Sequence, residues 1–204
     1  YIMKSFFSLF SDSAGELKKV TTITVTGMLM ALSIVLRNLA INISADLRIT
    51  FAFLGIMAVA MLYGPVVTMI ATTGIDVMGY FLDGFKARDY NFGLLVVKLI
   101  AAMIYGVILY KKATGKQLIT GIVISRVLVV VICQLVLTSS VLYYSYTNRN
   151  FPFMSGSEWT AFKIWMTPRL IKNVLMLPIE LVMSSIMLPA IRQAYTRVFK
   201  TRTA

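Results

Sequence analysis

Seven ionisable side chains lie inside otherwise apolar stretches of this sequence. The five basic and two acidic residues are Arg37, Lys98, Arg126, Arg169 and Lys172, and Asp76 and Glu180. A charge at the centre of a bilayer costs about 2.5–3.5 kcal/mol on insertion scales, so such residues usually face a bundle interior and mark a ligand or ion path. The surplus of basic residues therefore predicts an anionic ligand.

Each of these charges also has an alternative explanation. Arg37, Lys98 and Arg169 lie near the ends of their apolar stretches, where long basic side chains reach the lipid headgroups. Arg126 is deeper, about nine residues or roughly 13 Å into its stretch. Asp76 is similarly deep, so a structural ion pair between Arg126 and Asp76 is the alternative to a role in binding. The sequence leaves both alternatives open.

One helix face combines two cations with an amide. Arg169, Lys172 and Asn173 stand at i, i+3 and i+4, which places them side by side on a helix. This combination suits a carboxylate ligand. Pro168 is expected in the first turn of that helix, where proline is tolerated. Pro178 is expected to kink the same helix further along.

Two further pairs of residues have types and spacing that suggest a role, one in ligand binding and one in helix packing. Asp76 lies near Tyr80, and a carboxylate among aromatic rings can bind adjacent N–H groups of a heterocycle while a ring stacks on it. Gly27 and Ala31 are four residues apart, and small residues at this spacing allow close helix approach in membranes. Packing within the chain is the alternative role for that pair.

The composition determines which elements position these residues. The chain is 58% hydrophobic and 14% charged, whereas soluble domains carry about 25% charged residues. We therefore predict an all-α, polytopic membrane protein. The six predicted transmembrane helices are Val20–Ile43, two helices within Phe51–Leu82 that are separated at Gly64-Pro65, Gly93–Tyr110, Leu118–Tyr146 and Ile164–Ile191.

Three regions follow from this pattern. Residues 1–19 form a predicted interfacial segment, 20–191 the membrane domain and 192–204 a basic cytoplasmic tail. An N-terminus on the inside places ten basic residues in inner segments against five in outer loops, which predicts that both termini are cytoplasmic. The outer stretch Tyr143–Phe162 is rich in aromatic residues, and it forms either an interfacial belt or a lid over a pocket.

The sequence also excludes several classes of protein. It has no histidine and one cysteine, Cys133, which argues against a His/Cys zinc site and a disulfide scaffold. It contains no P-loop and no H-E-x-x-H or G-x-S-x-G motif. The net charge of +12 follows from membrane topology and does not indicate nucleic-acid binding. We expect a binding subunit without a cofactor, and not an enzyme.

Several motifs together resemble a known family. They are Phe51-Ala-Phe-Leu-Gly55, Leu62-Tyr-Gly-Pro65, Gly74-Ile-Asp76 with Tyr80, Pro168-Arg-Leu-Ile-Lys-Asn173 and Pro178-Ile-Glu180. With the six-helix layout, they resemble the substrate-binding S components of energy-coupling factor (ECF) vitamin transporters, most closely the folate-specific branch. The resemblance covers nearly the whole chain and implies a bacterial plasma membrane.

The resemblance implies a ligand and partners. Such S components bind a vitamin outside and deliver it inward when docked on a transmembrane coupling protein and two ATPases. An A-x-x-x-A motif on the first helix contacts the coupling protein, and Gly27 and Ala31 occupy the matching positions. For folate, the expected binding residues are Arg126, Arg169 and Lys172 on the anionic tail, Lys98 or Arg37 at the mouth, Asp76 or Asn173 on the pterin edge, and Tyr80 stacked on the pterin.

Other ligands stay open at this point. Riboflavin, biotin or pantothenate would keep the family and change the pocket. Outside the family, a small membrane protein or enzyme that binds anionic lipid headgroups is the main alternative. The loop that begins at Arg48 and leads to Phe51 is a candidate gate.

Overall fold

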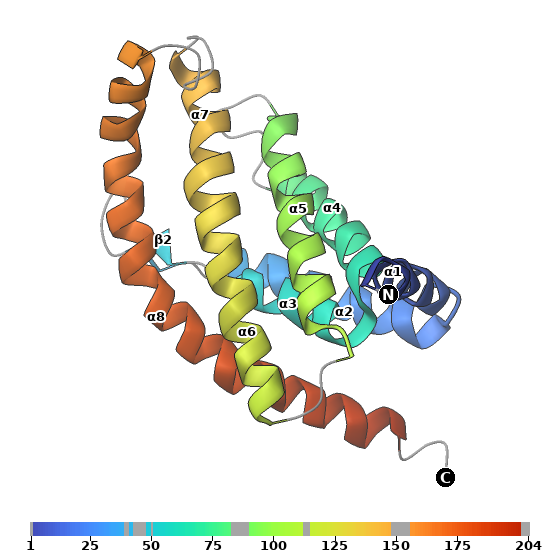
Figure 1. The fold of residues 1–204 in the computed structure, drawn as a ribbon. Coiled ribbons are helices and arrows are strands. Elements are labelled where there is room, and N and C mark those ends of the chain that lie inside the picture. Colours follow the sequence, from blue (N-terminus) through green and yellow to red (C-terminus); the bar gives the residue numbers. More distant parts are fainter. Residues whose placement is uncertain are drawn as a thin grey trace.

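The computed structural model describes residues 2–38, 41–42, 48–49, 51–82, 90–111, 115–147 and 156–200 (Figure 1). The elements follow one another as α1 (Ile2–Glu16), α2 (Val20–Asn38), β1 (Ile41–Asn42), β2 (Arg48–Ile49), α3 (Phe53–Tyr63), α4 (Pro65–Leu82), α5 (Phe92–Leu109), α6 (Lys116–Leu128), η1 (Val129–Leu137), α7 (Thr138–Thr147) and α8 (Gly156–Lys200). Here η1 is a π-helical segment inside one continuous helix that runs from α6 to α7.

The predicted all-α membrane fold is confirmed. Among the described residues, five helical segments are long and apolar enough to cross a membrane, and a shorter apolar helix is the sixth. The five are Val20–Arg37, Pro65–Leu82, Phe92–Leu109, Lys116–Ser145 and Phe162–Phe199.

The short sixth helix, α3, forms the centre of the bundle. Its 11 residues span about 16 Å, roughly half of the hydrocarbon core. Most of them are buried on all sides, including Leu54, Met57 and Val59, because α3 packs against α2, α4, α5 and α8. A helix that is apolar all round is stable in such a core position. We therefore describe α3 as a core helix of the bundle.

The predicted break at Gly64-Pro65 is confirmed. Helix α3 ends at Tyr63 and α4 begins at Pro65. Gly64 adopts a φ of +83°, a conformation that favours glycine. Pro65 occupies the first position of α4, where its missing N–H group is not needed.

The first predicted span is too long. Helix α2 ends at Asn38 instead of Ile43. Beyond it, Ile41 and Asn42 pair in antiparallel register with Ile49 and Arg48. β-Branched and asparagine side chains favour extended and turn structure over helix, which accounts for the shorter helix. The rest of the proposed gate loop, except Phe51, lies outside the described residues.

Helix α8 is longer than predicted, and the expected place of Pro168 is wrong. The helix begins at Gly156, so Pro168 lies in its interior together with Pro178 and Pro189. Figure 1 shows α8 curving along its length, and interior prolines are a usual cause of helix bending. The predicted tail is helical as far as Lys200 because α8 continues without a break.

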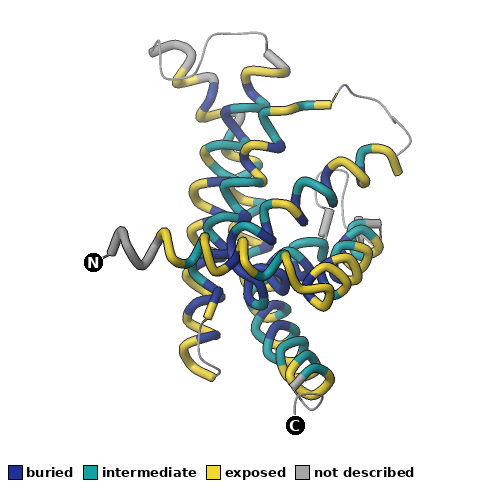
Figure 2. The backbone as a smooth tube through the Cα atoms, turned by 90° about the vertical axis from the view of Figure 1, so that its right-hand side faces the viewer, coloured by how far each residue is buried: buried dark blue, intermediate teal, exposed yellow. Residues whose placement is uncertain are grey.

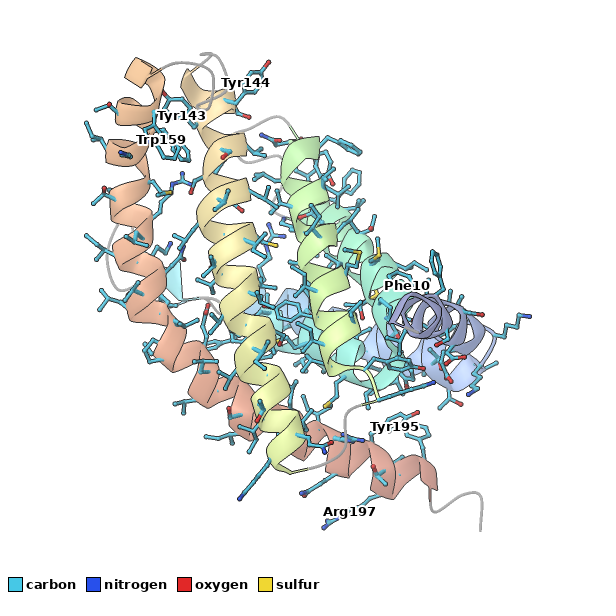
Figure 3. All side chains as sticks on the ribbon, in the orientation of Figure 1. Phe10, Tyr143, Tyr144, Trp159, Tyr195 and Arg197 are labelled. Carbon is cyan, nitrogen blue, oxygen red and sulfur yellow. The ribbon has the colours of Figure 1, made fainter. Side chains whose placement is uncertain are left out.

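The aromatic stretch is largely helical, with residues 148–155 outside the described part. Tyr143 on α7 and Phe162 on α8 are buried, and their rings meet edge to face at 5.6 Å. Trp159 stacks on Phe162 at 5.9 Å. Figure 3 shows Tyr143 and Trp159 at the same end of these two helices. These contacts join α7 to α8 and do not decide between a belt and a lid.

Helix α1 crosses the bundle instead of running along it. Figure 1 shows it end-on, whereas Figure 2 shows it extending sideways from the core. It packs against α4 and exposes Phe7. Residues 2–16 of the predicted N-terminal segment thus form a helix, and its interfacial position stays a prediction.

Candidate functional site

Arg126 is buried at the centre of the bundle and held by three helices. Its side chain is 3% exposed. Its Nη2 lies 2.5 Å from Glu180 Oε1, and its Nε donates to Glu180 Oε2 at 3.0 Å. Its Nη1 contacts the Tyr105 hydroxyl at 2.5 Å. The guanidinium also covers the Phe53 ring at 4.2 Å from its centroid. Arg126 thus connects α6 with α8, α5 and α3.

This arrangement answers the pairing question that the sequence left open. Arg126 pairs with Glu180, whereas Asp76 pairs with Lys98. A buried guanidinium needs such a partner because an uncompensated charge in a low-dielectric interior is strongly unfavourable. Both acids of the apolar segments are therefore engaged, Glu180 with Arg126 and Asp76 with Lys98.

A second cluster forms around Asp76 on α4. Its carboxylate accepts from the Lys98 ammonium of α5 and, at 2.9 Å, from the Tyr90 hydroxyl. Desolvation and this hydrogen bond raise the pKa of Tyr90 to about 12. The Tyr80 ring meets the Tyr90 ring at 5.2 Å with an angle of 76°. Asp76 is 10% exposed and Lys98 is 49% exposed, so the ammonium lies on the open side of the pair.

The Arg37 side chain lies close to this second cluster because it occupies the space beside a glycine of α4. A Cβ at Gly79 of α4 would collide with the Arg37 guanidinium. The absent side chain therefore makes room for the end of Arg37, which lies on α2. Because Gly79 is one turn from Asp76, four of the predicted residues gather at the same end of α4. They are Arg37, Asp76, Tyr80 and Lys98.

A third group lies on α8, as the spacing predicted. Arg169, Lys172 and Asn173 are all partly buried, while their neighbours Leu170, Ile171 and others are exposed. The same face continues to Met176, which is buried, and to Glu180. Glu180 is 11 residues beyond Arg169, or about 16 Å along the helix. We call Arg169, Lys172 and Asn173 the α8 polar stripe.

Two members of the α8 polar stripe have side chains that make no polar contact with the other described residues. Within the described part of the chain, the side chains of Lys172 and Asn173 make no hydrogen bond or ion pair. Buried polar groups usually have partners, and these two side chains are partly buried. Their position therefore suits a ligand that supplies acceptor atoms.

The predicted residues fall into groups on different sides of α3. Helix α8 packs against α3, α6, η1 and α7, whereas α4 packs against α1, α2, α3 and α5. The α8 polar stripe and the Asp76 cluster therefore belong to different helix pairs. Arg126 lies between them because its contacts extend to both α8 and α5.

Gly27 and Ala31 lie on the exposed face of α2. A Cβ at Gly27 would meet no heavy atom within 4 Å. Exposed apolar residues surround the pair, among them Ile23, Met28 and Val35. The face is thus smooth, apolar and open to lipid or to another membrane helix.

The comparison with protein families decides the classification. A family model described as "ECF transporter, substrate-specific component" matches residues 21–188. This match covers most of the chain. The protein belongs to this family.

Relatives of this S component carry a more specific description. The protein "Folate transporter FolT" of Leuconostoc mesenteroides subsp. mesenteroides is 29% identical over 161 residues, which cover 79% of this chain and 80% of that protein. The protein of the same name from Clostridium novyi (strain NT) is 27% identical over 165 residues, 80% of this chain and 86% of that protein.

A solved structure is similar along the same region. The chain described as "Crystal structure of FolT bound with folic acid" superposes with a TM-score of 0.63 at 27% identity. The superposition covers 82% of this S component and 92% of that chain. The helical bundle described above is therefore shared with a folic-acid complex.

Sequence reasoning missed three contributors to these clusters. Tyr105 and Tyr90 were not singled out, although each donates or accepts a hydrogen bond at a charged group. Glu180 was recognised as an acidic residue inside an apolar stretch, but no ion-pair partner was predicted for it. The signal for Glu180 was its place on the α8 polar stripe's face, 11 residues beyond Arg169. Nothing local in the sequence indicates the two tyrosines.

Proposed function

We propose that this S component binds folate on the outer side of a bacterial plasma membrane and delivers it inward when docked on an ECF module. The observation that carries the proposal is the similarity to a folic-acid complex over 92% of that chain, together with two relatives described as folate transporters. Folate also matches the charge pattern, because its glutamate tail has two carboxylates and the apolar segments carry a surplus of basic residues.

The α8 polar stripe is the proposed site of the anionic tail. Arg169 and Lys172 supply positive charge and Asn173 supplies an amide, all from one partly buried face. Charge-assisted hydrogen bonds to carboxylates are the strongest polar contacts available here. Arg126 belongs to the proposed set, but a folate carboxylate would share its guanidinium with Glu180 and Tyr105.

The Asp76 cluster is the proposed site of the pterin. Asp76 accepts hydrogen bonds from N–H groups, and Tyr80 offers a ring for stacking. The Lys98 ammonium and the Arg37 guanidinium would flank the mouth. In this arrangement folate bridges α4 and α8 across α3, which brings together two groups that the described side chains leave apart.

The exposed face of α2 is the proposed docking surface for the coupling protein. Gly27 and Ala31 permit close approach of a second helix because neither side chain projects far. Two ATP-binding subunits of the module would hydrolyse ATP. The proposed membrane orientation places both termini in the cytoplasm. Residues 1–19 then lie at the membrane surface, and residues 192–204 form the basic inner end.

A ligand-release experiment tests the proposal. The chain is purified in detergent and denatured, and the released small molecules are identified by absorbance and mass. Stoichiometric folate is the expected result. A flavin or another vitamin would retain the family and overturn the ligand, and an empty protein that does not bind added folate would overturn the proposed function.

A further inference from the structure

Ser13 is fully buried although it lies on α1, a helix that is mostly exposed. Its hydroxyl donates to the carbonyl oxygen of Tyr63 at 2.7 Å. It also accepts from the backbone N–H groups of Val66 at 3.0 Å and Val67 at 3.4 Å. One side chain therefore contacts the last residue of α3 and the first turn of α4.

These contacts replace a helix cap that α4 does not have in its own sequence. The first N–H groups of a helix lack partners within it. Serine is among the preferred residues at the N-cap position because its oxygen accepts from those groups. Here Gly64 stands before α4 and has no side chain. Ser13 supplies the oxygen from a helix about 50 residues earlier in the chain.

Two further contacts fix α1 at this place. A Cβ at Gly64 would lie 3.0 Å from both the Ser13 side chain and the Tyr110 ring, so α1, the break and the end of α5 are closely packed. Asp12 forms an ion pair with Lys111 at 2.5 Å. Residues 2–16 precede the region that matches the family model. The cap is therefore a feature of this chain outside that match.

The capped end and the Asp76 cluster belong to one uninterrupted helix. Pro65 and Asp76 are 11 residues apart on α4, or about 16 Å. At the first point α4 packs closely on α5, because a Cβ at Gly106 would collide with Pro65. At the second point Asp76 pairs with Lys98, also on α5. A shift of α4 at its capped end would therefore alter the alignment of Asp76 with Lys98.

We infer that Ser13 is a positioning residue for ligand binding: by capping α4 it holds Asp76 in register with α5. The inference rests on the proposed function, since the effect is read through folate. Linkage between two sites acts in both directions. A bound ligand at Asp76 therefore strengthens the docking of α1 at Ser13.

The test uses the full-length chain with hydrogen exchange and folate titration. Ser13→Ala is compared with Ser11→Ala, which removes the same hydroxyl from the exposed face of the same helix. We expect Ser13→Ala to accelerate exchange in the peptide that contains Val66 and Val67 and to raise the Kd for folate about fivefold, at the lower end of typical couplings. Ser11→Ala should change neither quantity.

The unmodified chain gives a second readout that needs no variant. Saturating folate should slow exchange at Val66 and Val67. Unchanged exchange in Ser13→Ala would overturn the cap. The positioning role would be overturned by equal folate affinity in the two serine variants. It would also be overturned if folate did not slow exchange at Val66 and Val67. Absence of folate binding by the unmodified chain would instead overturn the proposed function, and it is measured first.

Discussion

The guanidinium of Arg126 and the carboxylate of Glu180 form a two-pronged ion pair, with contacts of 2.5 and 3.0 Å, between helices that are far apart in the sequence. The pair is nearly inaccessible, at 3% and 11% exposure. It joins α6 to α8 on the helix face that also carries the α8 polar stripe.

Removing the acid from this pair is expected to destabilise the protein. Glu180→Gln leaves the Arg126 charge buried without its counter-ion, which should lower the free energy of unfolding by about 3–5 kcal/mol. Glu16→Gln is the control, because Glu16 pairs with the exposed Lys19 and such pairs contribute about 1 kcal/mol or less. Thermal unfolding in one detergent compares the two. Equal losses would show that Arg126 does not depend on Glu180.

Replacing both partners separates the cost of an unpaired charge from the value of the pair. The double variant Arg126→Met/Glu180→Leu contains no buried charge at this position. We expect it to regain most of the stability that Glu180→Gln loses, because buried ion pairs can often be exchanged for apolar residues of similar volume. A double variant as unstable as the single one would contradict this account.

The α8 polar stripe should dominate folate affinity. Arg169→Ala and Lys172→Ala each remove a charged hydrogen-bond donor, which should raise the Kd for folate about ten- to hundredfold. Lys163→Ala is the matched control, because Lys163 is a basic residue of the same helix that is exposed and lies over the Trp159 ring. Titration in detergent measures all three. An unchanged curve for Arg169→Ala would remove that residue from the proposed site.

Bulk on the exposed face of α2 should uncouple transport from binding. Ala31→Leu adds a large side chain where close helix approach is proposed, and the chain itself has space for it because Ala31 is exposed. Folate binding should therefore persist while uptake by the assembled transporter falls. Val174→Leu, on an exposed position of α8, is the control. Normal uptake by Ala31→Leu would place the docking surface elsewhere.

The Tyr90–Asp76 hydrogen bond should persist into alkaline solution. Folding raises the pKa of Tyr90 from 10.0 to about 12, so the neutral hydroxyl is favoured in the folded state. Its contribution to stability is complete below about pH 10 and is lost as the pH rises through about 12. Phenolate absorbance of the unmodified chain minus that of Tyr90→Phe isolates this group. A midpoint near 10 in the difference curve would contradict the assignment.

Local signals in the sequence predicted the helices well. The helix break at Gly64-Pro65 could be predicted because these two residues restrict or release the conformation of their own backbone. The face shared by Arg169, Lys172 and Asn173 followed from helical spacing alone. These features depend only on residues that are close together in the chain, which is why the fold class and most helix positions could be predicted.

Features that depend on distant partners could not be predicted in the same way. The sequence indicated only Asp76 as an ion-pair partner of Arg126, whereas the observed pairing with Glu180 depends on how α6 and α8 pack against each other and not on spacing. The buried role of Ser13 depends on a helix break about 50 residues later. The π-helical segment η1 has no compositional mark in its run of apolar residues, although Thr138 stabilises it by donating to the carbonyl of Cys133 at 2.8 Å.

Cys133 has a practical consequence for measuring topology. It is the only cysteine in the sequence, and its side chain is buried at 2% exposure in the core. Water-soluble thiol reagents should therefore leave the native chain unlabelled. A cysteine introduced at Lys116 or at Trp159 would give a signal against a silent background. Reagents applied from one side of a sealed vesicle would then report directly which end of the bundle faces the cytoplasm.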